Sequence, residues 1–112
     1  MATNPAVSLP RADAMRDALR KLDLLVVSEA VASNDTLSAR PDVLLPAATW
    51  GEKDGTVTNS ERRNSRQRPL FPPPGEARAD WRIVADVAAA TGHEDAFAWR
   101  SPAQVFREWA RL

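Results

Sequence analysis

The sequence contains no cysteine and only one histidine, His93. Without thiols it can form no disulfide, no thiolate zinc site and no iron–sulfur ligand set, and it offers no cysteine nucleophile. A metal site within this chain would therefore depend on carboxylates. Glu94 and Asp95 follow His93, but three adjacent loop side chains do not converge easily on one ion. We expect a solvated histidine and no metal site.

Long apolar runs and a surplus of charge are also absent. No segment approaches the roughly 18 apolar residues of a membrane helix, and the N-terminal end does not resemble a signal peptide. We therefore expect a soluble, cytoplasmic protein without a membrane partner. Fifteen basic residues balance fifteen acidic ones. Because phosphate binding usually needs a positive surplus, this balance argues against a nucleic-acid partner.

The first half of the chain predicts alternating helices and strands. Pro5 and Pro10 predict an irregular start. The apolar spacing then predicts a helix over 11–21. Continuous apolar runs at 24–27 and 43–45 are typical of strands buried on both faces of a parallel sheet. Between them, the polar residues 33–36 offer N-caps for a short helix through about Arg40.

The second half predicts loops followed by two helices. Residues 51–55 form a glycine-bounded charged loop, 56–59 are a candidate short extended piece, and 71–75 form a polyproline-like connector. Asp80 is a candidate cap for a helix through about residue 91, which Gly92 would end. Ser101 and Pro102 suit the start of a helix through Arg111.

These elements indicate an α/β fold, in which the first half is typical of the tail of a doubly wound sheet and is followed by a loop-rich segment and two further helices. We expect an α/β half over 1–50, a loop-rich segment over 51–80 and a helical segment over 81–112. Two strands alone do not form a stable sheet. We therefore expect that a missing part of the fold precedes residue 1.

Several sequence blocks follow one another in a specific order: TNPAVSLP (3–10), DVLLP (42–46), WGEKDGT (50–56), TNSERR (58–63), PPGEA (73–77) and DW (80–81). This order resembles the large catalytic subunits of molybdopterin oxidoreductases. Assimilatory nitrate reductases are the most similar members, and periplasmic nitrate reductases and formate dehydrogenases share the pattern. The resemblance covers nearly the whole chain.

The resemblance implies a cofactor and a role. In the family, this region is the C-terminal part of a doubly wound nucleotide-binding domain, and it closes one of the two such α/β domains that hold molybdenum bis(molybdopterin guanine dinucleotide). It also implies an iron–sulfur cluster elsewhere in the full-length enzyme, nitrate as a small anionic substrate, and the rest of the catalytic subunit as partner. No catalytic residue and no metal ligand is expected here, so the isolated chain should be inactive. The family's cofactor contacts match Asn4, Ser28, Glu29, Lys53 and Asp80.

Glu29 and Ser28 are predicted to follow a strand, where ligands bind in dinucleotide-binding α/β sheets. A carboxylate only accepts hydrogen bonds, so Glu29 suits ribose hydroxyls or the adjacent N–H donors of guanine. Many relatives carry the shorter aspartate at this position. The alternative is an exposed acid after a strand. The Ser28 hydroxyl can donate to a phosphate oxygen or merely satisfy the turn.

The other three positions have plain structural alternatives. Asn4 could both donate and accept through its amide, or be an ordinary turn residue. Lys53 could reach an anionic pyrophosphate, or be a solvated loop lysine. Asp80 is explained fully by helix capping, and the resemblance adds a contact with the nucleotide.

Two further questions remain open from the sequence. Four arginines lie close together in one segment: Arg62, Arg63, Arg66 and Arg68. We expect them to pair with carboxylates of other domains or to line the approach to an anionic substrate. The alternatives to a nitrate reductase are another molybdopterin oxidoreductase, such as a formate dehydrogenase, and a stand-alone nucleotide-binding or interaction module without catalysis.

Overall fold

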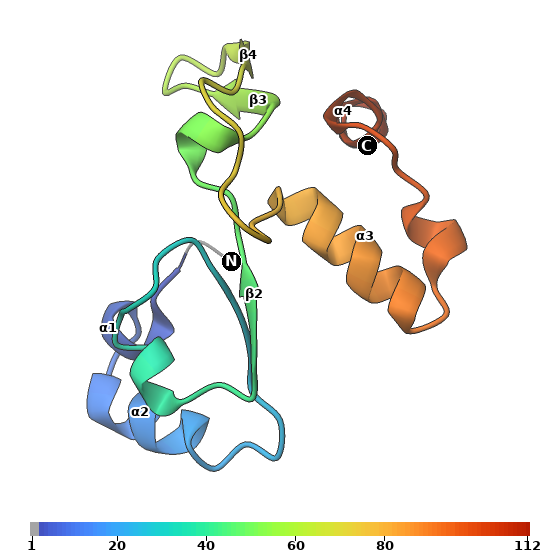
Figure 1. Cartoon of the computed structure of the whole chain (residues 1–112). Helices are drawn as coiled ribbons and strands as arrows, with labels where there is room; N and C mark the ends of the chain where they lie inside the picture. The colour runs from blue at the N-terminus through green and yellow to red at the C-terminus, as the bar shows by residue number, and fades with distance from the viewer. Residues whose placement is uncertain (1–2) are drawn as a thin grey trace. The chain divides into compact units, whose positions relative to one another are not determined.

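A computed structural model describes residues 3–112, which contain four α-helices and two two-stranded sheets (Figure 1). The chain divides into two compact units, Met1–Ala47 and Ala48–Leu112. The mixed α/β character predicted from the sequence is confirmed. The predicted doubly wound nucleotide-binding domain stays a prediction.

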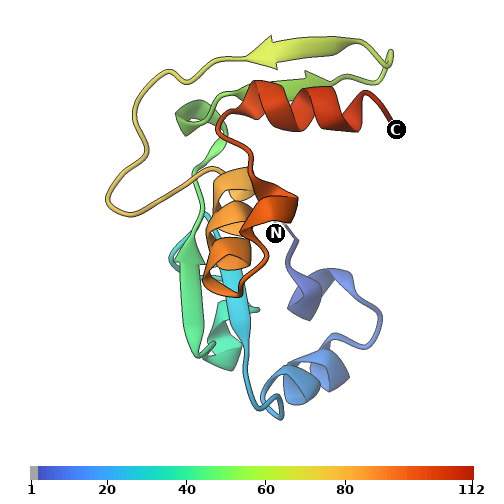
Figure 2. The same ribbon diagram turned by 90° about the vertical axis from the view of Figure 1, so that its right-hand side faces the viewer.

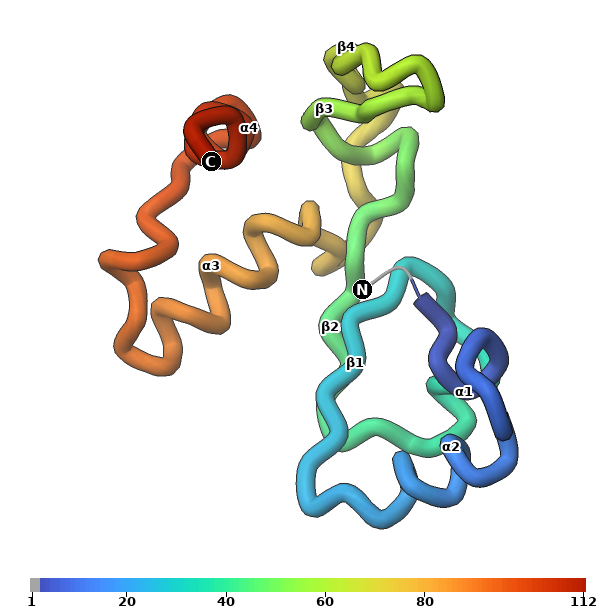
Figure 3. The backbone as a smooth tube through the Cα atoms, turned by 180° about the vertical axis from the view of Figure 1, so that it is seen from behind, coloured from blue at the N-terminus to red at the C-terminus, as the bar shows by residue number. Residues whose placement is uncertain are grey.

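The sheet of the first unit is a parallel pair, as the sequence predicted. Strand β1 (Val26–Glu29) pairs with β2 (Val43–Pro46), and Val26 lies opposite Val43. The two segments run side by side in Figure 3. Strand β1 begins two residues later than predicted. The reason is local, because the backbone N–H of Leu25 donates to the side chain of Asp42 at 2.7 Å before the strand begins.

The helices of the first unit differ from the prediction at their ends. The prediction of an irregular start was wrong, because α1 (Pro5–Ser8) is a short helix with proline at its first position. Proline is tolerated there, since the first N–H groups of a helix have no partner within it. Helix α2 (Ala12–Leu19) is shorter than predicted and follows Arg11, whose backbone is left-handed. Residues 37–39 form a 3₁₀ turn.

The apolar side chains of the two parallel strands are not buried on both faces. Val26, Val43 and Leu44 are 48, 40 and 45 % exposed. The buried residues of this unit are mostly small: Ala6, Leu25, Thr36, Ala39 and Ala47. The described chain therefore covers the strands only in part.

The sheet of the second unit is an antiparallel hairpin of β3 (Gly55–Thr58) and β4 (Asn64–Gln67). Strand β3 overlaps the predicted extended piece, whereas β4 was missed. The turn is organised by Asn59, whose side-chain oxygen accepts the backbone N–H groups of Glu61 and Arg63 at 3.0 and 2.9 Å. Before the hairpin, a 3₁₀ turn at Trp50–Glu52 starts with a capping box.

The two predicted C-terminal helices are present as α3 (Asp80–Ala90) and α4 (Pro102–Trp109). As predicted, Gly92 is the stop residue just after α3, and it has a φ of +79°. Two bonds complete this C-terminal motif, from the N–H of Gly92 to Ala89 and from that of His93 to Ala88. Helix α4 runs along the hairpin (Figure 2). Within residues 3–112, the helices are too short or too polar to cross a membrane.

Candidate functional site

The predicted cofactor-binding residues are divided between the two units. Asn4, Ser28 and Glu29 lie in the first, and Lys53 and Asp80 in the second. In the part of the chain that the structure describes, no three histidine or acidic residues are grouped so as to hold a metal ion.

Glu29 is the last residue of β1, whereas the prediction placed it just beyond a strand that ended at residue 27. One carboxylate oxygen accepts the N–H of Ala30 at 2.8 Å, and the other accepts the side-chain amide of Asn34 at 2.9 Å. These two bonds fix the orientation of the carboxylate. Because a carboxylate has about four lone-pair sites, each oxygen can accept a further bond.

The hydroxyl of Ser28 is buried and has no hydrogen-bond partner among residues 3–112. A buried polar group without a partner costs about 1–3 kcal/mol, so such atoms are uncommon in folded proteins. The alternative in which this hydroxyl merely satisfies the turn is therefore not what the structure shows. The group lies beside Glu29 near the carboxyl end of a parallel strand, where an incoming acceptor would remove the penalty.

Asn4 is the residue before α1, and its side chain binds within the first unit. Its side-chain oxygen accepts the hydroxyl of Thr36 at 2.6 Å, and the Thr36 oxygen accepts the N–H of Ala6 at 3.3 Å. Thr36 is only 4 % exposed. Asn4 therefore connects the first helix to the turn before the 3₁₀ segment, and a cofactor contact would have to use its NH₂ group.

Asn34, which the sequence predicted only as a possible helix cap, contacts one of the predicted site residues. Its side-chain oxygen accepts the N–H of Leu37 at 2.8 Å, which is a capping contact of the expected kind. Its NH₂ group donates to Glu29. Asn4 and Glu29 are thus bonded to the same short segment, 34–36. The bond to Glu29 forms because the chain reverses direction after β1. The spacing of the residues in the sequence does not predict this reversal.

In the second unit, Lys53 and Asp80 form an ion pair with 2.6 Å between Nζ and Oδ2. Their side chains are 28 and 35 % exposed. The predicted capping by Asp80 was wrong: the N-cap is Ala79, and Asp80 is the first residue of α3. The carboxylate binds the ammonium group instead, because a charged donor is a stronger partner than a neutral N–H.

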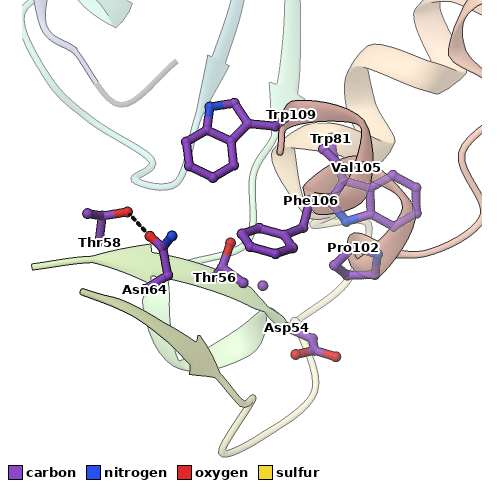
Figure 4. A pocket seen from close by; sticks show the side chains of 10 residues that line it. Asp54, Thr56, Thr58, Asn64, Trp81, Pro102, Val105, Phe106 and Trp109 are labelled. Atoms are coloured by element: carbon purple, nitrogen blue, oxygen red, sulfur yellow. Dashed lines mark hydrogen bonds between the residues drawn. The ribbon is translucent and has the colours of Figure 1, made fainter. Parts of the chain in front are cut away.

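The second unit also has a pocket of about 470 Å³ between α4 and the hairpin (Figure 4). Trp81, Phe106 and Trp109 provide an aromatic wall, and Thr56 and Thr58 of β3 are among the polar residues opposite. The indole N–H of Trp81 is buried and has no partner within residues 3–112. None of the five predicted site residues lines this pocket.

One arginine of the arginine-rich segment has a carboxylate partner within the described chain. Arg66 forms an ion pair at 3.0 Å with Asp54 of its own unit, so this arginine does not need another domain for a partner. The hydrogen bond from Arg66 lowers the pKa of Asp54 below its ordinary value, and the same bond raises the pKa of Arg66. It stays a prediction that Arg62, Arg63 and Arg68 pair with carboxylates of other domains or line the approach to an anionic substrate.

Comparisons with known proteins agree with the resemblance seen in the sequence. The molybdopterin oxidoreductase family model matches residues 1–90. All 112 residues align with a nitrate reductase of Klebsiella oxytoca at 56 % identity, and with one of Shewanella frigidimarina at 46 %. An F420-dependent formate dehydrogenase subunit alpha of Methanocaldococcus jannaschii is 43 % identical over 96 % of the chain. The chain spans only 12 to 16 % of the length of these relatives. It belongs to the molybdopterin oxidoreductase family.

Proposed function

We propose that this chain is a segment of the catalytic subunit of a cytoplasmic nitrate reductase. Its part in that enzyme is to bind the guanine dinucleotide portion of molybdenum bis(molybdopterin guanine dinucleotide). The identity with two nitrate reductases supports the reaction, and the family supports the cofactor. When bound, the molybdenum centre supplies the two-electron reduction of nitrate to nitrite. The residues of this chain hold and orient the cofactor.

The groups in the first unit suit such a ligand. A guanine nucleotide presents N–H donors on the base, hydroxyls on the ribose and a negatively charged diphosphate. Glu29 supplies fixed acceptor oxygens at the end of β1, and Ser28 supplies a buried donor. The observation that carries the proposal is the buried, unpartnered hydroxyl of Ser28 beside that carboxylate, near the strand end where nucleotides bind in α/β sheets.

Lys53 suits the diphosphate. Only one of the three N–H donors of an ammonium group is needed for the bond to Asp80, so two can serve another acceptor. Asp80 keeps this positive charge at the start of α3, where the helix dipole also favours an anion. In this proposal Lys53 contacts the ligand and Asp80 orients Lys53.

Formate oxidation is the second candidate reaction, because three formate dehydrogenase alpha subunits are 38 to 43 % identical to the chain. The proposed cofactor contacts would be the same in both enzymes. The full-length protein should be assayed with nitrate and a reductant, and separately with formate and an electron acceptor. Turnover of nitrate alone is expected, whereas turnover of formate alone would overturn the proposed reaction.

The cofactor contacts are tested by Ser28→Ala and Glu29→Ala in the full-length enzyme. Molybdenum and guanine nucleotide per polypeptide are expected to fall severalfold in both variants. Asp23→Ala is the matched control, because Asp23 is an exposed acidic residue shortly before the same strand. Normal cofactor content and normal nitrate reduction in both variants would remove Ser28 and Glu29 from the site.

A further inference from the structure

We infer that Asn34 is a positioning residue that orients the Glu29 carboxylate toward the guanine base, and so helps the site select guanine over adenine. This inference rests on the proposed function of Glu29. Asn34 lies five residues after Glu29 and donates its side-chain amide to Glu29 Oε2 at 2.9 Å. The contact is part-buried, so water competes with it less than on an open surface.

Asn34 is itself held in place on its other side. Its side-chain oxygen accepts the N–H of Leu37 at 2.8 Å, and its backbone oxygen accepts the N–H of Ser38 at 3.1 Å. Its NH₂ group is therefore presented to Glu29 from an ordered turn. The N–H of Ala30 holds the other carboxylate oxygen at 2.8 Å. Between them, these two donors determine which lone pairs of Glu29 remain for a ligand.

The orientation of a carboxylate matters for the identity of the base. Guanine presents two adjacent N–H donors, which the two oxygens of one carboxylate can accept together. Adenine presents one N–H donor beside a ring nitrogen, and that nitrogen would face a carboxylate oxygen with no proton between them. A carboxylate held in one orientation therefore favours guanine, whereas a freely rotating one discriminates less.

A single substitution separates this role from simple capping of the turn. In Asn34→Asp, a carboxylate oxygen still accepts the N–H of Leu37, so the turn keeps its cap. The donor to Glu29 is lost, and a second negative charge faces the Glu29 carboxylate. Ser38→Ala is the matched control, because it removes the bond from the Ser38 hydroxyl to Asp35 in the same turn and leaves Glu29 untouched.

The experiment uses the full-length protein in two forms. In the cofactor-loaded enzyme, the release rate of guanine nucleotide is measured after purification. In the cofactor-free protein, the Kd values for GMP and AMP are compared. We expect Asn34→Asp and Glu29→Gln to release nucleotide about tenfold faster, since each removes a hydrogen bond involving a charged group. Both should also lower the preference for GMP, whereas Ser38→Ala should match the wild type.

The outcomes distinguish the inference from the proposed function. If Glu29→Gln lowers retention and the GMP preference but Asn34→Asp behaves as the wild type, Asn34 is only a turn cap and the inference is wrong. If Glu29→Gln itself changes neither quantity, the proposed function of Glu29 fails. Amide hydrogen exchange at β1 shows whether Asn34→Asp is folded. Where that exchange is disturbed, the comparison is repeated with Asn34→Ser, which is predicted to lower the GMP preference as well.

Discussion

The ammonium nitrogen of Lys53 lies 2.6 Å from Oδ2 of Asp80, although 27 residues separate the two in the sequence. The pair joins the charged loop before the hairpin to the first turn of α3. Because both side chains are about one-third exposed, the pair should contribute no more than about 1 kcal/mol to stability. If Lys53 contacts the diphosphate as proposed, the pair matters mainly because it fixes the position of the Lys53 charge.

The first prediction concerns the separate roles of Lys53 and Asp80. If Lys53 contacts the diphosphate and Asp80 only orients it, Lys53→Gln should release guanine nucleotide about tenfold faster from the full-length enzyme. Asp80→Asn should have a smaller effect, about twofold, because it leaves the ammonium group in place. Equal effects, with the double variant no worse than either single one, would show that the pair acts only as a structural unit.

The second prediction concerns the pH dependence of the hairpin. Arg66 lowers the pKa of Asp54 below its ordinary value of 3.8, chiefly through a hydrogen bond to the carboxylate. A lowered pKa in the folded state means that the ion pair favours folding above the ordinary pKa of the unfolded chain. This contribution is lost as the pH falls through the folded value. The hairpin should therefore loosen only in acid below about pH 4.

This pH dependence can be measured by carboxyl-carbon NMR of aspartate-labelled protein. Arg66→Gln should bring the pKa of Asp54 back up toward its ordinary value. Arg63→Gln is the control, because Arg63 lies in the same arginine-rich segment and is not among the groups that shift Asp54. An unchanged Asp54 titration in Arg66→Gln would contradict the assigned cause.

The elements that the sequence predicted well are those with a strong local signal. The apolar runs gave both parallel strands, and Gly92 gave the end of α3. Strand β4 was missed because Asn64–Gln67 contains no apolar residue, and its pairing is directed by the turn at Asn59 and by the partner strand. Its formation is therefore a tertiary effect that periodicity does not record.

In the candidate site, too, some features could be predicted from the sequence and others depend on contacts between distant residues. The family resemblance singled out Ser28 and Glu29, and their predicted position after a strand supported the choice; the two residues lie together at the end of β1. The ion pair between Lys53 and Asp80 was not foreseen, because local capping explained Asp80 without any distant partner. The contact between Asn34 and Glu29 was missed for the same reason. Local rules identify groups able to bond, but the folded chain decides between competing partners.

The third prediction concerns the left-handed residue that ends α3. Gly92 has a φ of +79°, so Gly92→Ala should destabilise this helix end by about 1 kcal/mol. Gly55→Ala is a matched control, because a Cβ at Gly55 would meet no atom within 4 Å and its φ lies outside the left-handed region. Amide exchange at Gly92 and His93, whose N–H groups close the motif, should become faster only in Gly92→Ala. No change there would show that the motif does not hold the helix end.

The fourth prediction concerns the incomplete burial of the parallel strands. Val26, Val43 and Leu44 are 40 to 48 % exposed, and a two-stranded sheet is marginal in water. If this chain is a segment of a larger subunit, these side chains should be covered by other parts of that subunit. The isolated 112 residues should then unfold over a broad temperature range and bind a hydrophobic dye below it.

One substitution tests whether Leu44 is exposed in the isolated chain and covered in the full-length protein. Leu44→Lys should reduce dye binding by the isolated chain, because it removes an exposed apolar group. In the full-length protein, the same change should lower the melting temperature, because it would bury an unpaired charge against the covering segment. Lys21→Ala, at an exposed position in the same unit, should change neither property. A sharp two-state transition of the isolated chain, together with a full-length protein that tolerates Leu44→Lys, would show that the strands need no cover from the rest of the subunit.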